Sequence, residues 1–221
     1  MRCLLPRKGA AALPTLVGPG VTATGILFAS ATAGPARVLT LRPQSTNVKI
    51  GVVSDSHDHG ASLAAAVVHA RDWGAKAILH CGDIIGPNSL RSAMAAGLPL
   101  HVVHGNNLGD MLSMQRMAQE STGALVYYGG DASFALGGRK LFMTHYPHLA
   151  RGMACTGEFD AVFCGHSHVA QVECVVGARG STPLVNPGTV AGIGAEATMV
   201  LGDLETLSFQ IISLDGTGTR P

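Results

Sequence analysis

Charged residues are scarce in this chain of 221 residues, at 13% against 47% hydrophobic residues. The first 47 residues contain five arginines and lysines but no Asp or Glu, so the remainder holds ten basic against fourteen acidic residues. A domain with that negative balance is poorly suited to holding a nucleic-acid duplex, and we expect no such partner. The length and apolar content instead indicate one globular domain with a substantial core.

A cysteine framework is also lacking. No CxxC pair is present among Cys3, Cys81, Cys155, Cys164 and Cys174, which argues against a zinc knuckle and against a redox motif. Cys81 and Cys164 end apolar runs, so both are interpreted as buried thiols rather than ligands. With no disulfide pattern, a reducing compartment is the default, and we expect a cytoplasmic protein.

The N-terminal segment lacks an uninterrupted apolar run of membrane-spanning length. Four prolines break it: Pro6, Pro14, Pro19 and Pro35. We expect residues 1–46 to be a low-complexity extension, either disordered, a targeting segment or the product of a start codon called too far upstream. Residues 47–221 are expected to form the domain, without membrane contact. The basic start and the small residues at 28–33 loosely resemble a secretory signal, so export is the alternative location.

Short apolar runs alternate with helix-length segments in the first half of the domain. Strands are predicted at 48–53, 75–80 and 100–104, and helices at 60–73, from Asn88 or Ser89 to Ala96, and from Asp110 to Glu120. The second half predicts strands at 132–136, 140–144, 160–164, 170–176, 183–186, 196–201 and 206–213, with a helix at 149–155. Two mixed sheets packed face to face, with helices outside, accommodate both halves in an α/β fold.

Polar side chains close several of these apolar runs. They are Asp55, His57, Asp83, Asn106, His145, His166 and His168. Strand ends are where α/β sheets place their sites, and the glycines before Asp83, Asn106 and His166 permit sharp turns. One such residue is usually a turn or cap. Seven at one sheet edge are hard to explain that way, because burying unpaired carboxylates and imidazoles together is costly unless cations neutralise them.

The donor set of these seven residues mixes carboxylates, an amide carbonyl and imidazoles. That mixture favours borderline divalent ions over Ca²⁺, and seven ligands suit two ions sharing a carboxylate rather than one tetrahedral ion. We expect two divalent cations, with Mn²⁺ preferred and Ni²⁺, Fe²⁺, Zn²⁺, Co²⁺ or Mg²⁺ as alternatives. The remaining histidines of the domain's strands and helices are interpreted as structural, because no second motif residue is nearby: His59, His69, His80, His101 and His104.

The chain resembles the calcineurin-like metallophosphoesterase superfamily, in particular its small single-domain phosphodiesterase branch. The resemblance rests on motifs that occur in the family's order: Asp-x-His, Gly-Asp, Gly-Asn, a His after a strand, Gly-His-x-His and Asn-Pro-Gly. The resemblance covers about residues 48–213 and implies a four-layer α/β/β/α sandwich. It implies one metal held by Asp55, His57, Asp83 and His168. It implies a second metal held by Asp83, Asn106, His145 and His166, with Asp83 bridging.

Two segments depart from that family pattern. Asn107 stands where larger members carry a His that assists the leaving group, and an amide cannot supply a proton. The segment after His145 reads Tyr146-Pro147-His148 instead of Gly-His, so the substrate-side loop differs.

The resemblance implies that the metal pair activates a water, which hydrolyses a small phosphodiester directly. A phosphomonoesterase with the same site is one alternative. Another is a non-catalytic scaffold like the retromer subunit of this fold, although such proteins lack parts of the metal set. A homo-oligomer is left open.

Overall fold

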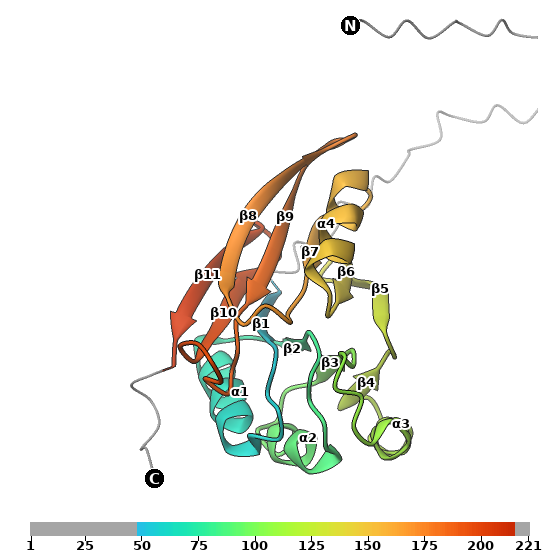
Figure 1. The fold of residues 1–221 in the computed structure, drawn as a ribbon, viewed down its shortest axis with the longest axis vertical. Helices are drawn as coiled ribbons and strands as arrows, with labels where there is room; N and C mark the ends of the chain where they lie inside the picture. Colours follow the sequence, from blue (N-terminus) through green and yellow to red (C-terminus); the bar gives the residue numbers. More distant parts are fainter. Residues whose placement is uncertain (1–47, 215–221) are drawn as a thin grey trace, which may run out of the picture. The chain divides into compact units, whose positions relative to one another are not determined.

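The computed structural model describes residues 48–214, which form two β-sheets and four α-helices (Figure 1). The expected N-terminal extension, residues 1–46, lies outside the described residues. Within the described part, the order of strands and helices follows the sequence prediction, with one additional strand at Leu125–Tyr127.

The first sheet is mixed and has six strands. Its order is β11 (Ser208–Ser213), β10 (Thr198–Asp203), β1 (Lys49–Val53), β2 (Ala77–His80), β3 (Leu100–Val102) and β4 (Leu125–Tyr127). The four strands from β1 to β4 are parallel to one another. On the other side of β1, β10 pairs antiparallel with β1, and β11 pairs antiparallel with β10. The parallel strands are connected through α1 (Gly60–Trp73), α2 (Pro87–Met94) and α3 (Met111–Glu120). Their carboxyl ends therefore meet at one edge of the sheet.

The second sheet is mixed and has five strands. Its order is β5 (Asp131–Leu136), β6 (Arg139–Thr144), β7 (Ala161–Phe163), β9 (Gly180–Pro187) and β8 (Ala170–Gly177). β6, β7 and β9 are parallel, while β5 and β8 pair antiparallel at the two edges. The helix α4 (Pro147–Thr156) follows β6 and packs on this sheet. The strands predicted at 132–136 and 140–144 form the β5–β6 hairpin, which turns at Gly137-Gly138.

Three apolar clusters separate four layers. One joins α1, α2 and α3 to the first sheet, and another joins α4 to the second sheet. The cluster between them contains residues of both sheets, including Ile50, Leu79 and Phe163, and no helical residue. Strand alternation accounts for this division, since Ile50 and Val52 face the other sheet whereas Val53 faces the helices. The four-layer α/β/β/α prediction is confirmed.

Helix ends show where local sequence signals decided the structure. Gly74 ends α1 in the left-handed conformation, and the Asp110 side chain caps α3 by accepting from the Ser113 amide, as predicted. The predicted start of α2 was wrong, because Gly86 is its N-cap and Pro87 opens the first turn. None of the described helices is long and apolar enough to cross a membrane.

Candidate metal centre

The seven candidate ligands converge where the carboxyl ends of both sheets' parallel strands meet. Asp55 and His57 follow β1, Asp83 follows β2 and Asn106 follows β3; His145 follows β6, and His166 and His168 follow β7. Each of the seven has a ligand-type atom within 3.9 Å of such an atom of another. Residues distant in the sequence are thus gathered at one place, as the sequence predicted.

The backbone at these ligands adopts conformations that side chains normally avoid. Five of the seven have positive φ angles between 41° and 70°: Asp55, His57, Asp83, His166 and His168. Each such residue costs of order ~1 kcal/mol or more, and such strain is concentrated at functional sites. The glycines before them allow close approach. A Cβ on Gly105 would lie 2.1 Å from Asp83 Oδ1, and one on Gly165 would lie 1.9 Å from Ser54 Oγ.

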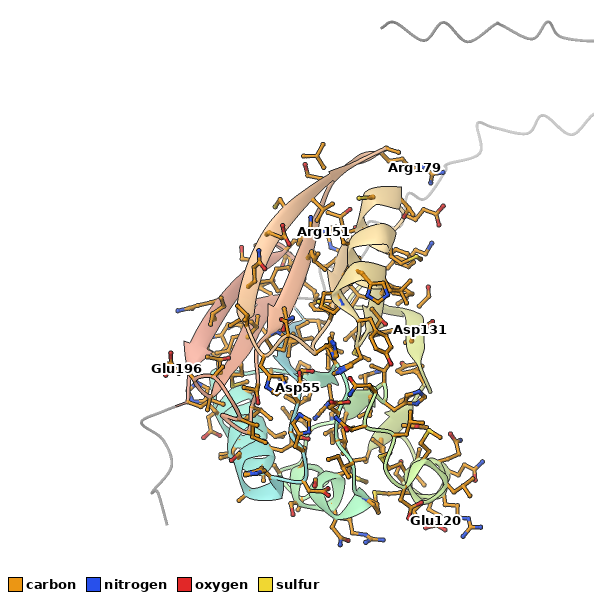
Figure 2. The ribbon with its side chains drawn as sticks, viewed as in Figure 1. Asp55, Glu120, Asp131, Arg151, Arg179 and Glu196 are labelled. Carbon is orange, nitrogen blue, oxygen red and sulfur yellow. The ribbon has the colours of Figure 1, made fainter. Side chains whose placement is uncertain are left out.

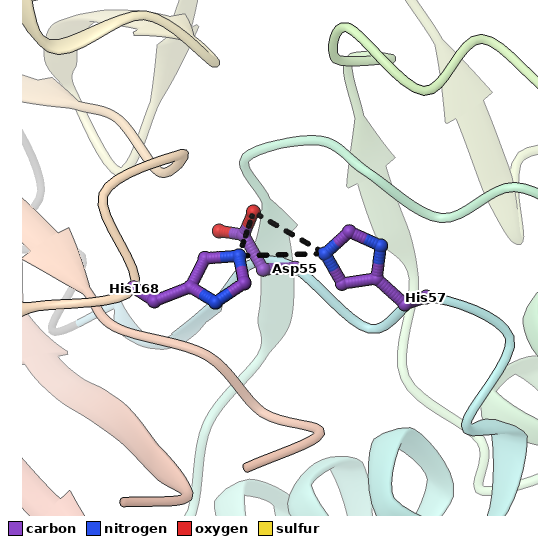
Figure 3. Close-up of side chains that lie close together, drawn as sticks. All are labelled: Asp55, His57 and His168. Carbon is purple, nitrogen blue, oxygen red and sulfur yellow. Dashed lines mark hydrogen bonds and ion pairs between the residues drawn. The ribbon is translucent and has the colours of Figure 1, made fainter. Parts of the chain in front are cut away.

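Asp55, His57 and His168 form the first candidate group (Figure 3). Asp55 Oδ1 lies 3.2 Å from His168 Nε2 and 3.8 Å from His57 Nε2, and these two nitrogens are 3.4 Å apart. The Asp55 side chain is fully buried. Its Oδ2 accepts from the His166 amide at 3.0 Å, but Oδ1 has no hydrogen-bond partner. A buried carboxylate oxygen without a donor is unfavourable and indicates a site for a cation.

Asp55, Asp83 and His145 form a second candidate group beside the first. His145 Nε2 lies 3.4 Å from Asp83 Oδ1 and 3.9 Å from Asp55 Oδ1. The other Asp83 oxygen lies 3.8 Å from His57 Nε2, so this carboxylate faces both groups. Asn106 Oδ1 extends the second group, at 3.0 Å from His145 Nε2 and 2.8 Å from His166 Nδ1.

Backbone carbonyls fix the tautomers of two of these histidines. His145 Nδ1 donates to the Cys81 carbonyl at 2.8 Å, and His168 Nδ1 donates to the Ile193 carbonyl at 2.7 Å. In the neutral rings, Nε2 then presents a lone pair toward the carboxylates. Lone pairs facing carboxylate oxygens repel unless a cation lies between them, and a hydrogen bond from the second ring nitrogen is the usual support of a metal-binding histidine. The donor set therefore fits divalent metal ions.

Asn107 holds one of the carboxylates in place. Its backbone amide donates to Asp83 Oδ1 at 2.9 Å, and its side-chain amide donates to Asp83 Oδ2 at 2.5 Å. Both Asp83 oxygens are thereby oriented, and one is aimed at each candidate group. The family pattern indicates only that Asn107 replaces a proton donor, and it does not predict the contact of Asn107 with Asp83.

His80 is a site residue that sequence reasoning missed. The sequence predicts a structural role for it within a strand, yet in the fold it contacts Ser56, between Asp55 and His57. Its Nδ1 accepts from the Gly82 amide at 3.2 Å, so the ring proton is on Nε2 and donates to Ser56 Oγ at 3.0 Å. Burial, followed by repulsion from His145, lowers the pKa of His80 to about 3. The ring is therefore a neutral link between two ligand-bearing loops.

The segment Tyr146-Pro147-His148, which departs from the family pattern, lines the exposed side of the site. The Tyr146 ring lies 5.5 Å from the ring of His145, 5.8 Å from that of His166 and 5.9 Å from that of His148. His148 is exposed. Two other histidines have tyrosine partners: His101 pairs with Tyr128 at 2.8 Å and His104 with Tyr127 at 3.0 Å. Burial lowers the pKa of both imidazoles.

Comparisons with known proteins indicate a family and a shared fold. A family model described as a calcineurin-like phosphoesterase superfamily domain matches residues 48–207. The phosphodiesterase MJ0936 from Methanocaldococcus jannaschii is 25% identical over 171 residues, which cover 76% of this chain and all of that protein. A solved structure of an archaeal phosphodiesterase has a TM-score of 0.68 at 24% identity, over 76% of this chain and all of that one. Vps29 from Chaetomium thermophilum has a TM-score of 0.52 at 15% identity, over 78% of this chain and 89% of that one, and shows the shared fold alone.

Proposed function

The chain belongs to the calcineurin-like phosphoesterase superfamily, and from that premise we propose that it hydrolyses phosphodiesters with the help of two divalent metal ions. The observation that carries the proposal is the buried Asp55 Oδ1, which has no hydrogen-bond partner and lies within 3.9 Å of the Nε2 atoms of three histidines. A buried carboxylate oxygen without a donor does not stabilise the fold, whereas it is the expected ligand of a cation.

We assign Asp55, His57, Asp83 and His168 to one ion. Asp83, Asn106, His145 and His166 are assigned to the other. Asp83 is the shared ligand in this scheme, and its two oxygens facing His57 and His145 support that role. Asp55 also lies in both candidate groups, so it is close to both ions. Mn²⁺ is the preferred ion, because oxygen and imidazole ligands together suit it.

When bound, such a pair supplies positive charge for the phosphoryl oxygens and a nucleophile made from water. The chain's own residues hold and orient that pair. The buried cysteines nearest the site offer no alternative nucleophile. Burial raises the pKa of the Cys164 thiol to about 12 and that of Cys81 well above its usual value, which leaves both protonated near neutral pH. Direct attack by water is therefore favoured over a covalent intermediate on either cysteine.

A diester is the substrate class that we favour over a monoester. The similarity to a protein named as a phosphodiesterase supports this choice.

Metal content and turnover together test this proposal. We expect purified protein to lose activity toward bis(p-nitrophenyl) phosphate after chelation and to regain it with Mn²⁺, with two ions per chain by elemental analysis. Turnover of p-nitrophenyl phosphate should be slower under the same conditions. Activity that survives complete metal removal, or a preference for the monoester, would contradict the proposal.

A further inference from the structure

A hollow of about 340 Å³, lined by both apolar and polar side chains, lies beside the metal centre on the outer face of the second sheet. It is bounded by the first turns of α4, the loop after β7 and the adjoining ends of β8 and β9. Its apolar lining is Cys164, Val169 and Leu184, together with Pro147. Its polar side chains are Arg151, Ser167, Gln171, Glu173 and Asn186. The volume falls at the small end of the range for ligand sites, roughly 300–1,000 Å³.

Two polar side chains interrupt the apolar face that α4 covers. Ala154 of the helix packs with Val175 and Leu184 in an apolar cluster, and Leu184 also lines the hollow. Toward the metal centre, the same face of β8 carries Glu173 and Gln171. A sheet face covered by a helix is normally apolar, so these two polar side chains are an exception near the site.

The hollow and the metal centre share a wall. Ser167 lines the hollow and stands between His166 and His168, and Pro147 follows His145 by two residues. Asn186 fixes this wall, because its side-chain amide donates to the Gly165 carbonyl at 2.8 Å and to Ser167 Oγ at 3.0 Å. A phosphate bound at the metals would therefore have one of its substituents next to the hollow.

The polar groups of the hollow combine donors with acceptors. Arg151 forms an ion pair with Glu173 through Nη2, and its other guanidinium N–H groups have no partner among the described residues. The Gln171 side chain is exposed and supplies both an N–H₂ donor and a carbonyl acceptor. Paired donors and acceptors beside an aromatic or guanidinium plane are what the edge and face of a nucleobase require.

We infer that this hollow binds the nucleoside of a nucleoside phosphodiester, which makes Arg151 and Gln171 residues that determine specificity. The inference rests on the proposed function, since it names the substrate class of the same site. The phosphate is held at the metal centre, and the nucleoside on its non-leaving side extends past Ser167 toward Arg151.

Two substrates with the same leaving group test the inference. Both thymidine 5′-(p-nitrophenyl phosphate) and bis(p-nitrophenyl) phosphate release p-nitrophenolate, but only the first carries a nucleoside. We expect Arg151→Ala to lower kcat/KM for the thymidine ester about tenfold or more, as for a lost charged hydrogen bond, and to change that for the diaryl ester by less than about twofold. Gln171→Ala should act in the same direction with a smaller effect.

Arg179→Ala is the matched control. Arg179 lies in the turn at the tip of the β8–β9 hairpin, where it pairs with Glu158 at 4.0 Å, and Figure 2 shows it beyond Arg151 as seen from Asp55. It should leave both substrates unchanged. Equal losses on the two substrates in Arg151→Ala, or no loss on either, would overturn the inference.

Binding separates this inference from the proposed function. If the unmodified protein hydrolysed neither substrate, the proposed function would fail, but calorimetry with thymidine 5′-monophosphate would still probe the hollow. We expect Arg151→Ala to bind thymidine 5′-monophosphate about tenfold more weakly than Arg179→Ala does, both with Mn²⁺ and with chelator. Equal affinities of the two variants would rule out the hollow as a nucleoside site.

Discussion

Asp55 carries a conflict between stability and function at the scale of one side chain. Its Oδ1 is buried and unpartnered, and it faces Nε2 lone pairs on His145 and His168. In Asp55→Asn, the new amide can donate to one of those nitrogens while the other atom still accepts from the His166 amide. We expect the metal-free variant to gain about 1 kcal/mol in free energy of unfolding. Metal-dependent activity should fall about 100-fold or more.

Urea unfolding with chelator and turnover with Mn²⁺ check both halves of this expectation. Thr189→Ser is a suitable control, since its hydroxyl donates to the backbone carbonyl of Asp55 rather than to the carboxylate. A metal-free Asp55→Asn protein that is less stable than the parent would show that Asp55 Oδ1 is satisfied without a cation.

Asn107 acts on the metal site through another residue. Its two donors orient the Asp83 carboxylate, so Asn107→Ala should weaken metal binding about 10- to 100-fold, the usual effect of removing a partner of a ligand. Metal titration followed by calorimetry measures this directly. The neighbouring Leu108→Ala, at an exposed side chain, should leave metal affinity unchanged. Unaltered affinity in Asn107→Ala would mean that the backbone amide alone positions Asp83.

At the scale of elements, the loops after β2 and β3 are locked together by a glycine. Gly109 has a φ of 55°, and a Cβ there would lie 1.8 Å from the Ile85 carbonyl oxygen, which accepts from the Asp110 amide. Gly109→Ala should therefore separate the two loops and destabilise the protein by about 1–2 kcal/mol or more. Activity should fall as well, because these loops carry Asp83, Asn106 and Asn107.

Replacing Gly152 by alanine should have the opposite effect on stability from replacing Gly109. It lies inside α4, and a Cβ there would meet nothing within 4 Å. Gly152→Ala should stabilise the protein by about 0.5–1 kcal/mol with unchanged activity. Thermal unfolding of the two variants, with turnover measured in parallel, tests the pair. Two alanine variants of equal stability would contradict the assigned role of Gly109.

The end of β2 contributes a pH dependence through His80. Burial lowers the folded-state pKa of this imidazole from 6.5 to about 3, so the folded protein excludes a proton that the unfolded chain takes up. The stability that His80 provides is complete above pH ~6.5 and is lost progressively as the pH falls toward 3. We expect urea midpoints, measured with chelator, to fall between pH 7 and 4. That slope should be reduced in His80→Gln and retained in His59→Gln, whose side chain is exposed.

Element by element, the sequence was most informative where a signal is local. Gly74 and Asp110 marked helix ends, and the polar residues after apolar runs gave all seven candidate ligands. The strand β4 (Leu125–Tyr127) was missed because it is defined by its pairing with β3, which is distant in the sequence. The roles of His80 and Asn107 were missed because each depends on a contact between loops that are more than twenty residues apart.

At the scale of the whole molecule, the candidate metal centre joins the two sheets. Asp55, His57, Asp83 and Asn106 come from the first sheet, whereas His145, His166 and His168 come from the second. Direct contacts across the junction include the bond from the His166 amide to Asp55 Oδ2 and that from the Val190 amide to the Ser54 carbonyl. Cations bound between these ligands would therefore stabilise the packing of both sheets rather than one loop.

Metal removal should consequently lower the stability of the whole domain. At a free metal concentration about 100-fold above Kd, binding stabilises the folded state by about 2.7 kcal/mol per site. For a domain of this size, that corresponds to a rise in Tm of about 5–10 °C. Thermal unfolding with Mn²⁺ and with chelator measures the shift in Tm.

Amide hydrogen exchange locates the stabilisation. With metal bound, exchange should slow at His166 on one sheet and at Asn107 on the other. Asp55→Asn should show neither the rise in Tm nor the slower exchange. Slower exchange confined to one sheet would mean that its ligands bind metal without those of the other.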